Sequence, residues 1–219
     1  RDRLRDGGVA NTALHPRGIE PGVFSPERRN PEVRRKLLEL CGLPEDASLL
    51  LGVGRLAAEK CWPLVIAAAM AAGHSKPVGL VILGEGNKRR SLLRQIGPNP
   101  HIKLLKPVRD RELYASILAS GDALVHGCEA ETFCMAGAEA RASGLPVVVP
   151  DRGGAADHGK DGAGLAYEAG NVTSARDAIL EILEQQRDHV ARPVRTMEDH
   201  FRALFDSYAG IAAARLRAA

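Results

Sequence analysis

Short apolar runs alternate with stretches of helical spacing through most of this chain. The runs fit buried strands at residues 48–53, 78–83, 102–105, 123–126 and 147–149, and the stretches fit helices at 60–72, 88–96, 111–119 and 133–142. Parallel strands need long crossover connections, which are usually helices. Strands that are apolar along their whole length are typical of a sheet covered on both faces. The pattern therefore predicts an α/β fold built on a doubly wound parallel sheet.

The two ends of the chain differ from this middle. Residues 10–26 are punctuated by Pro and Gly, and a helix is expected at 31–41, with Asn30 as its N-cap and Pro31 as its first residue. Further helices are expected at 171–187 and 195–215. The last carries an apolar stripe formed by Met197, Phe201, Leu204, Phe205 and Tyr208.

Composition narrows the classes of protein. Hydrophobic residues at 45% and charged residues at 26% predict a folded core, and 4% aromatics fit α/β layers better than a β-sandwich. The net charge of +3 comes largely from arginines near both ends, interpreted as solvated helix faces, with a face for anionic lipid or nucleic acid as the alternative. Four scattered cysteines suggest reduced thiols in the cytoplasm. The longest apolar stretch, 64–72, is too short for a bilayer, and no signal-peptide pattern starts the chain.

The first candidate ligand site follows the strand at 48–53. In open α/β sheets, ligands bind at the carboxyl ends of the strands. Here Gly52 and Gly54 allow a ligand to approach the backbone, and Arg55 and Lys60 can both reach one anion. A tight turn followed by a solvated helix start is the alternative interpretation of the same residues.

The second candidate site follows the strand at 123–126. A helix is expected to begin near Phe133, and helix N-termini offer unpaired N–H groups and a positive dipole end to phosphate. Glu139, about two turns into this helix, is placed to accept both hydroxyls of a ribose, and Glu131 to face a group beyond the phosphates. Alternatively, Glu131 complements the helix dipole and Glu139 is a surface residue. Burial of an unpartnered carboxylate is costly, which favours a ligand for Glu139.

Other polar residues give weaker signals. The turn Gly84-Glu85-Gly86 resembles a phosphate turn, although such turns more often only close a strand. His126 stands at a strand end, where a core or rim histidine is more common than a ligand contact. No Asp-x-Asp pair occurs, so a metal that bridges a diphosphate has no obvious ligands. We expect neither metal nor cofactor.

In their order along the chain, four stretches resemble the carboxyl-terminal half of the retaining glycosyltransferases of the GT-B fold, family four (group 1). They are His15-Pro16-Arg17-Gly18-Ile19-Glu20 with Phe24 and Pro26; Gly54-Arg55-Leu56 with Glu59-Lys60; residues 81–86; and the Glu, seven residues, Glu pattern from Glu131 to Glu139, followed by 142–148 and Gly153-Gly154. The resemblance covers nearly the whole chain, and it implies a Rossmann-like domain that binds a nucleotide sugar.

The resemblance also implies roles for individual residues. Arg55 and Lys60 would neutralise the donor diphosphate and Glu131 would contact the donor sugar, so these three are the candidate catalytic residues. Glu139 would hold the ribose, and the base would pack near Val108. The other candidate donor contacts are Gly54, Thr132, Phe133, Cys134, Met135 and Ala136. Transfer would retain the anomeric configuration without a metal.

Two cysteines depart from the family pattern. Cys134 stands where Gly is usual, which adds a side chain close to the phosphates, and Cys61 stands where Gly or Asn is common. The resemblance further implies an amino-terminal acceptor domain before Arg1. The expected division is an interdomain lead-in at 1–26, a nucleotide-sugar-binding domain at 27–190, and a terminal helix at 191–219 that would pack on the acceptor domain.

The parent protein is accordingly expected to move a hexose from a nucleoside-diphosphate sugar to a glycan or lipid-linked acceptor. It would act in the cytoplasm, with peripheral association at the inner membrane face as an option, and without a nucleic-acid partner. This chain alone would bind the donor but transfer little, because the reaction needs both walls of the cleft. The alternatives are a non-catalytic nucleotide-binding module, a sugar-nucleotide epimerase-like domain, and a dinucleotide-binding oxidoreductase domain, although Gly-x-Gly continues into Arg55-Leu56-Ala57 here.

Overall fold

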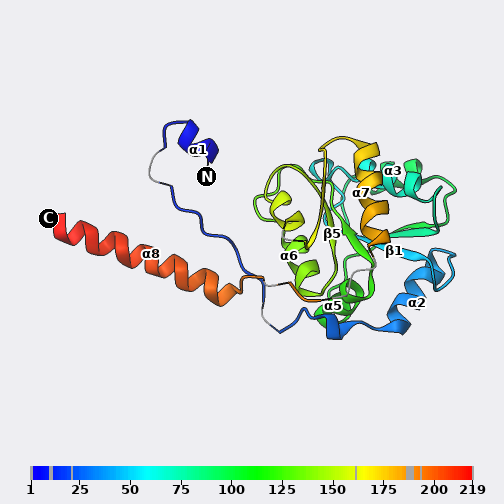
Figure 1. The fold of residues 1–219 in the computed structure, drawn as a ribbon, viewed down its shortest axis with the longest axis horizontal. Coiled ribbons are helices and arrows are strands. Elements are labelled where there is room, and N and C mark those ends of the chain that lie inside the picture. Colours follow the sequence, from blue (N-terminus) through cyan, green and yellow to red (C-terminus); the bar gives the residue numbers. More distant parts are fainter. Residues whose placement is uncertain are drawn as a thin grey trace. The chain divides into compact units, whose positions relative to one another are not determined.

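A computed structural model describes residues 2–9, 12–20, 22–160, 162–185, 190–192 and 194–218. The chain divides into two compact units. The larger is Gly22–Pro193, and the smaller combines Arg1–Pro21 with Val194–Ala219 (Figure 1). Among the described residues, no helix combines the length and the apolar character needed to cross a membrane.

Six parallel strands form the sheet of the larger unit, in the order β3-β2-β1-β4-β5-β6. Their bounds are β1 Ser48–Val53, β2 Val78–Leu83, β3 Ile102–Leu105, β4 Ala123–Val125, β5 Val147–Pro150 and β6 Gly164–Tyr167. The predicted doubly wound parallel sheet is confirmed. Strand β6 was not predicted, because its four residues, GLAY, give too short an apolar run to stand out.

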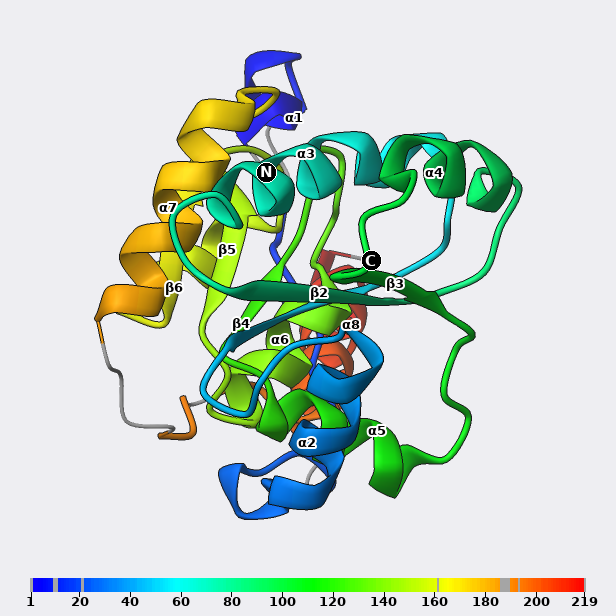
Figure 2. The ribbon, with the colours of Figure 1, turned by 90° about the vertical axis from the view of Figure 1, so that its right-hand side faces the viewer.

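Helices cover both faces of this sheet (Figure 2). One layer contains α3 (Trp62–Ala72), α4 (Arg89–Ile96) and α7 (Val172–Glu184), and the other contains α2 (Pro31–Leu40), α5 (Arg111–Ser120) and α6 (Met135–Ala142). Short 3₁₀ turns lie at Pro26–Arg28, Ala58–Lys60 and Ala156–Gly159. The two layers bury the strands on both faces, which accounts for their continuous apolar runs.

Strands β1 and β4 are neighbours at the centre of the sheet, with Leu50 beside Ala123. The chain builds β2 and β3 on one side of β1 before it crosses to β4, β5 and β6 on the other. The connections that leave β1 and β4 therefore diverge, and a crevice opens at their carboxyl ends. Both candidate ligand segments follow these two strands, so the topology brings them together.

Helix starts show where local sequence decides the backbone. The predicted N-cap of α2 is confirmed, because Oδ1 of Asn30 accepts hydrogen bonds from the amides of Glu32 and Val33 at 2.9 and 3.3 Å. Helix α6 begins at Met135 and not at Phe133 as predicted. The reason is the left-handed backbone of Cys134, with φ of 66°, which turns the chain just before the helix.

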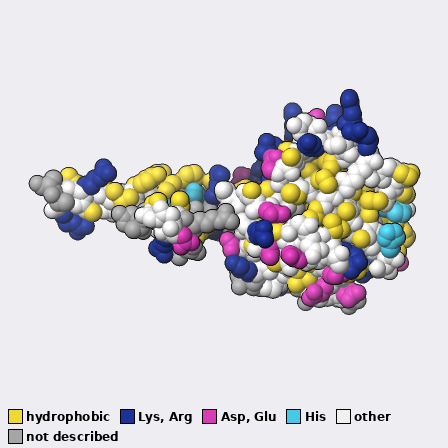
Figure 3. All heavy atoms as spheres, turned by 90° about the horizontal axis from the view of Figure 1, so that it is seen from above, with side chains coloured by type: hydrophobic (Ala, Val, Ile, Leu, Met, Phe, Trp, Pro, Cys, Tyr) yellow, Lys and Arg dark blue, Asp and Glu magenta, His cyan; other side chains and the backbone are white. Residues whose placement is uncertain are grey.

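The smaller unit contains α1 (Asp2–Asp6) and α8 (Met197–Ala218). Ile19 forms a parallel bridge with Thr196, and a Cβ added at Gly18 would lie 1.9 Å from the Thr196 carbonyl oxygen, so this close approach requires glycine. The predicted apolar stripe on α8 is exposed at Phe201, Phe205 and Tyr208. Figure 3 shows hydrophobic side chains at the surface of this part of the chain. Its packing on an acceptor domain stays a prediction.

Candidate functional site

A cavity of about 340 Å³ lies at the carboxyl ends of β1 and β4. Its lining comes from two segments: Val53, Gly54, Arg55 and Lys60 at the end of β1 and beyond it, and His126, Glu131, Cys134, Met135, Ala136 and Glu139 beyond β4. The volume is within the usual range for small-molecule sites. The cavity contains all three candidate catalytic residues.

Backbone packing holds the segment after β1 in place. The indole Nε1 of the buried Trp62 donates a 2.7 Å hydrogen bond to the carbonyl oxygen of Arg55. A Cβ at Gly84 would lie 2.0 Å from the Gly54 carbonyl oxygen, and one at Gly86 would lie 2.5 Å from that of Leu56. The turn after β2 is therefore glycine-rich because two backbones meet there, which accounts for its glycines without a ligand.

The two cations of this segment differ in their surroundings. The Arg55 side chain is 76% exposed and pairs with Glu59 at 2.6 Å. Exposed pairs of this kind contribute little to stability, so the guanidinium is readily available to another anion. The Lys60 side chain is 17% exposed, and its ammonium is bonded to Oε1 of Glu131 across the cavity.

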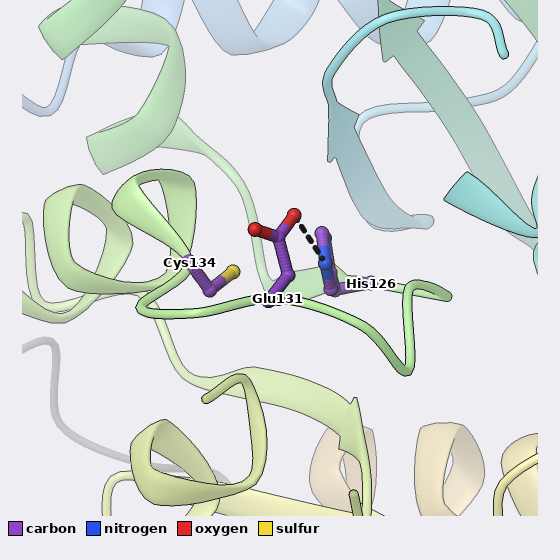
Figure 4. A group of neighbouring side chains, drawn as sticks. All are labelled: His126, Glu131 and Cys134. Carbon is purple, nitrogen blue, oxygen red and sulfur yellow. Dashed lines mark ion pairs between the residues drawn. The ribbon is translucent and has the colours of Figure 1, made fainter. Parts of the chain in front are cut away.

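Glu131 has two basic neighbours. Besides Lys60, His126 places Nε2 3.3 Å from the same carboxylate oxygen (Figure 4). The contact with His126, assisted by Lys60, outweighs burial and lowers the pKa of Glu131 to about 2. The carboxylate is therefore ionised at neutral pH, and it has one oxygen, Oε2, outside these contacts.

The amino end of α6 faces the same cavity. The amides of Gly137 and Ala138 bond back to the Cys134 carbonyl oxygen, which leaves the amides of Met135 and Ala136 at the open end of the helix. Such an end carries partial positive charge. It supplies anion-binding groups next to Lys60 without any further side chain.

Three of the predicted donor contacts lie outside the cavity lining: Val108, Thr132 and Phe133. Thr132 is exposed, and the carbonyl oxygen of Phe133 lies 2.6 Å from Nε2 of His158, whose ring packs edge-on against Phe133. Phe133 therefore anchors the turn before α6 to a buried histidine. Val108 is half-buried in the connection after β3.

Glu139 has a partner that the sequence did not predict. The Tyr114 hydroxyl, on α5, donates a 2.8 Å hydrogen bond to Oε2 of Glu139. Burial raises the pKa of Glu139, and this hydrogen bond opposes the rise. The carboxylate thus has one satisfied oxygen while the residue still lines the cavity.

His126 and Val53 also line the cavity, although neither was predicted as a donor contact. His126 directly follows β4, and the position at a strand end was the available signal. Tyr114 gave no signal, because its role depends on a contact between α5 and α6. Among the residues described, the site combines Arg55, Lys60 and a helix end for an anion with two carboxylates for hydroxyl groups.

Comparison with known proteins identifies relatives that are glycosyltransferases. Residues 34–197 match the family model described as glycosyl transferases group 1. A GDP-mannose-dependent alpha-mannosyltransferase of Corynebacterium glutamicum is 34% identical over 189 residues, which are 85% of this chain and 43% of that protein. A GDP-mannose-dependent alpha-(1-6)-phosphatidylinositol dimannoside mannosyltransferase of Mycobacterium tuberculosis is 35% identical over 143 residues, 65% of this chain and 36% of that protein.

Solved structures show the same fold. A glycosyltransferase from Rickettsia africae superposes with a TM-score of 0.76 at 16% identity, covering 93% of this chain and 58% of that one. This chain spans less than half the length of the two curated relatives. Because the family model matches most of the residues of this chain, the chain belongs to the glycosyl transferases group 1.

Proposed function

We propose that this chain binds the nucleoside-diphosphate sugar donor of a retaining hexosyltransferase. One observation carries the proposal: Arg55, Lys60 and the open end of α6 share one cavity with Glu131 and Glu139. The first three attract a diphosphate, and the two carboxylates accept hydrogen bonds from hydroxyl groups. A nucleoside-diphosphate sugar has both kinds of group in one molecule.

In the proposed pose, Arg55, Lys60 and the amides of Met135 and Ala136 hold the diphosphate. As the sugar leaves, negative charge grows on this diphosphate, and cations already in place stabilise it without a metal. Glu131 meets the sugar and Glu139 the ribose. The base lies toward Val108 in the connection after β3.

We further propose GDP-mannose as the donor, because the relatives from Corynebacterium glutamicum and Mycobacterium tuberculosis are both named as dependent on it. The acceptor is a glycan or a lipid-linked molecule, bound by a part of the whole protein that faces this cavity. The name of the Mycobacterium tuberculosis relative includes phosphatidylinositol dimannoside, a lipid, which supports action beside a membrane, and we place that action on the cytoplasmic side.

The test is a binding experiment on this chain. Melting temperatures and calorimetric titrations are measured with GDP-mannose, GDP, UDP, ADP and NAD, with and without Mg²⁺. We expect GDP and GDP-mannose to stabilise the chain most, equally with and without Mg²⁺. Arg55→Ala should weaken binding, whereas Arg94→Ala, an exposed arginine of α4 outside the cavity lining, should not.

A second titration tests the placement of the ribose. Wild-type chain should prefer GDP to its 2′,3′-dideoxy analogue, and Glu139→Ala should bind the two alike, because the carboxylate that accepts the hydroxyl groups is gone. Stabilisation by NAD alone would refute the proposed function. An undiminished preference for GDP in Glu139→Ala would refute the pose.

A further inference from the structure

Three side chains of metal-binding type converge on one side of the donor cavity. A ring nitrogen of His126, a carboxylate oxygen of Glu131 and Sγ of Cys134 all lie within 4.8 Å of one another (Figure 4). His126 follows β4, Glu131 stands in the loop, and Cys134 immediately precedes α6. The three therefore come from a single short connection whose backbone is fixed at both ends.

His126 supplies an independent reason to expect a ligand here. The residue is only 3% exposed, and its Nε2 has no hydrogen-bond partner among the described residues. Oε1 of Glu131 lies 3.3 Å from this nitrogen, close enough for an ion pair but not aligned as a hydrogen bond. Buried side-chain nitrogens are nearly always satisfied, so this atom calls for a partner.

We propose that His126, Glu131 and Cys134 form a binding site for Zn²⁺, and that the bound ion competes with the donor sugar. One nitrogen, one oxygen and one sulfur ligand suit Zn²⁺ and do not suit Mg²⁺, which takes oxygen ligands. In tetrahedral zinc sites, ligand atoms at about 2.0–2.3 Å from the ion lie about 3.3–3.8 Å apart. A contraction of about 1 Å within this loop gives that geometry, with the fourth position left open.

Binding has a simple proton and charge balance. The Sγ–Zn bond forms as the thiol proton of Cys134 leaves to solvent, and the metal supplies the charge that makes this deprotonation favourable. In the structure, the Lys60 ammonium is bonded to Oε1 of Glu131, so it competes with the ion for this carboxylate. The ion must displace the ammonium, so Lys60 weakens the metal site.

The effect on the donor rests on the proposed function. If Glu131 meets the donor sugar, an ion that takes this carboxylate removes the sugar's contact and stands beside the amides of Met135 and Ala136. Zn²⁺ should therefore weaken binding of GDP-mannose more than binding of GDP. Gly is usual in the family pattern at this position, so the thiol ligand of Cys134 departs from that pattern.

The test uses the reduced chain stripped of metal, with Co²⁺ as a spectroscopic substitute for Zn²⁺. A thiolate bound to Co²⁺ absorbs in the near ultraviolet, and we expect this band in wild type and in Cys128→Ser, the buried-cysteine control. Cys134→Gly should lose the band, and Lys60→Met should strengthen it at limiting Co²⁺. Since even outer-shell partners change metal affinity about 10–100-fold, loss of this ligand should weaken Zn²⁺ binding by at least about tenfold.

Two further arms make the result decisive. Glycine suits the left-handed backbone at position 134, so Cys134→Gly should fold, and His126→Asn serves as a second variant if it does not. Wild type without the band, or a band unchanged in Cys134→Gly, would overturn the site. GDP-mannose affinity unchanged by Zn²⁺ while the band forms would overturn the competition. Titration of GDP-mannose in the presence of a chelator tests the proposed function separately.

Discussion

The Tyr114 hydroxyl donates a 2.8 Å hydrogen bond to Oε2 of Glu139, which joins helix α5 to helix α6. Burial raises the pKa of both groups. The bond therefore supports a carboxylate that burial would otherwise drive toward its neutral form. Phe24 packs edge-on against the Tyr114 ring, which helps to hold the ring in place.

Tyr114→Phe should weaken GDP binding, although Tyr114 acts through Glu139 and not by contact with the ligand. Loss of a hydrogen bond to a charged group costs about 1.5–3 kcal/mol of unfolding free energy. It also removes a group that lowers the pKa of Glu139, so this pKa rises further. GDP affinity is measured by calorimetry from neutral to acid pH. As the pH is lowered, the affinity should begin to fall at a higher pH in Tyr114→Phe than in wild type.

The pH profile separates a positioning role from a structural one. A variant that is merely less stable keeps the wild-type profile while its melting temperature drops. Ala119→Ser, a change on the same helix outside the cavity lining, is the matched control for stability. An identical pH profile in wild type and Tyr114→Phe would contradict the assignment.

Glu139→Gln should be more stable than wild type at neutral pH, yet bind GDP more weakly. The folded protein has the Glu139 pKa raised above its usual 4.5, so the ionised form is held at a cost. A raised acid pKa means that stability falls as pH rises from the unfolded value through the folded one. The glutamine variant lacks this cost. Its advantage in unfolding free energy over wild type should therefore appear at about pH 4.5 and grow as the pH rises.

Urea unfolding at a series of pH values measures this divergence. Glu39→Gln is the control: Glu39 is exposed and paired with Arg35, and because exposed pairs contribute little, this variant should change the free energy of unfolding very little. Equal stability of wild type and Glu139→Gln at neutral pH would refute a costly carboxylate. A retained charge of this kind is expected where function requires it.

The sequence predicted the sheet well and the helix starts less well. Strands at 48–53, 78–83 and 102–105 have the predicted bounds, because continuous apolar runs report burial directly. The helix predicted at 60–72 is instead a 3₁₀ turn followed by α3 from Trp62, since Cys61 turns left-handed with φ of 49°. Residues other than glycine rarely adopt a positive φ, so a cysteine in the sequence does not indicate a left-handed turn.

Most of the cavity lining was predictable, because residues that follow β1 and β4 must meet at a switch of strand order. The contacts inside it were not. Lys60 and Glu131 are 71 residues apart and were assigned to different parts of the donor, yet they pair with each other. Tyr114 reaches Glu139 across a contact between helices that no local pattern encodes.

Cys61 provides a test of backbone strain next to the cavity. Because its φ is positive, Cys61→Gly should be more stable than Cys61→Ala by about 1 kcal/mol, the reverse of the usual order of these residues. Cys41, with φ of −81°, is the matched control, and there the alanine variant should be the more stable one. Urea unfolding of the four variants measures both differences. Alanine equal to or better than glycine at position 61 would contradict the left-handed backbone.

Gly52→Ala should loosen the segment that carries Arg55. A Cβ at position 52 would lie 2.8 Å from Cζ3 of Trp62 and 3.2 Å from Cγ1 of Ile82, and overpacking of this kind costs about 1–3 kcal/mol. Trp62 is the chain's one tryptophan, so its fluorescence reports the displacement directly. Because its indole also holds the Arg55 carbonyl, GDP affinity should fall with the shift.

In a double-mutant cycle, Trp62→Phe removes the clashing atoms, so Gly52→Ala should cost less stability in that background than in wild type. The same cost in both backgrounds would show that the clash lies elsewhere.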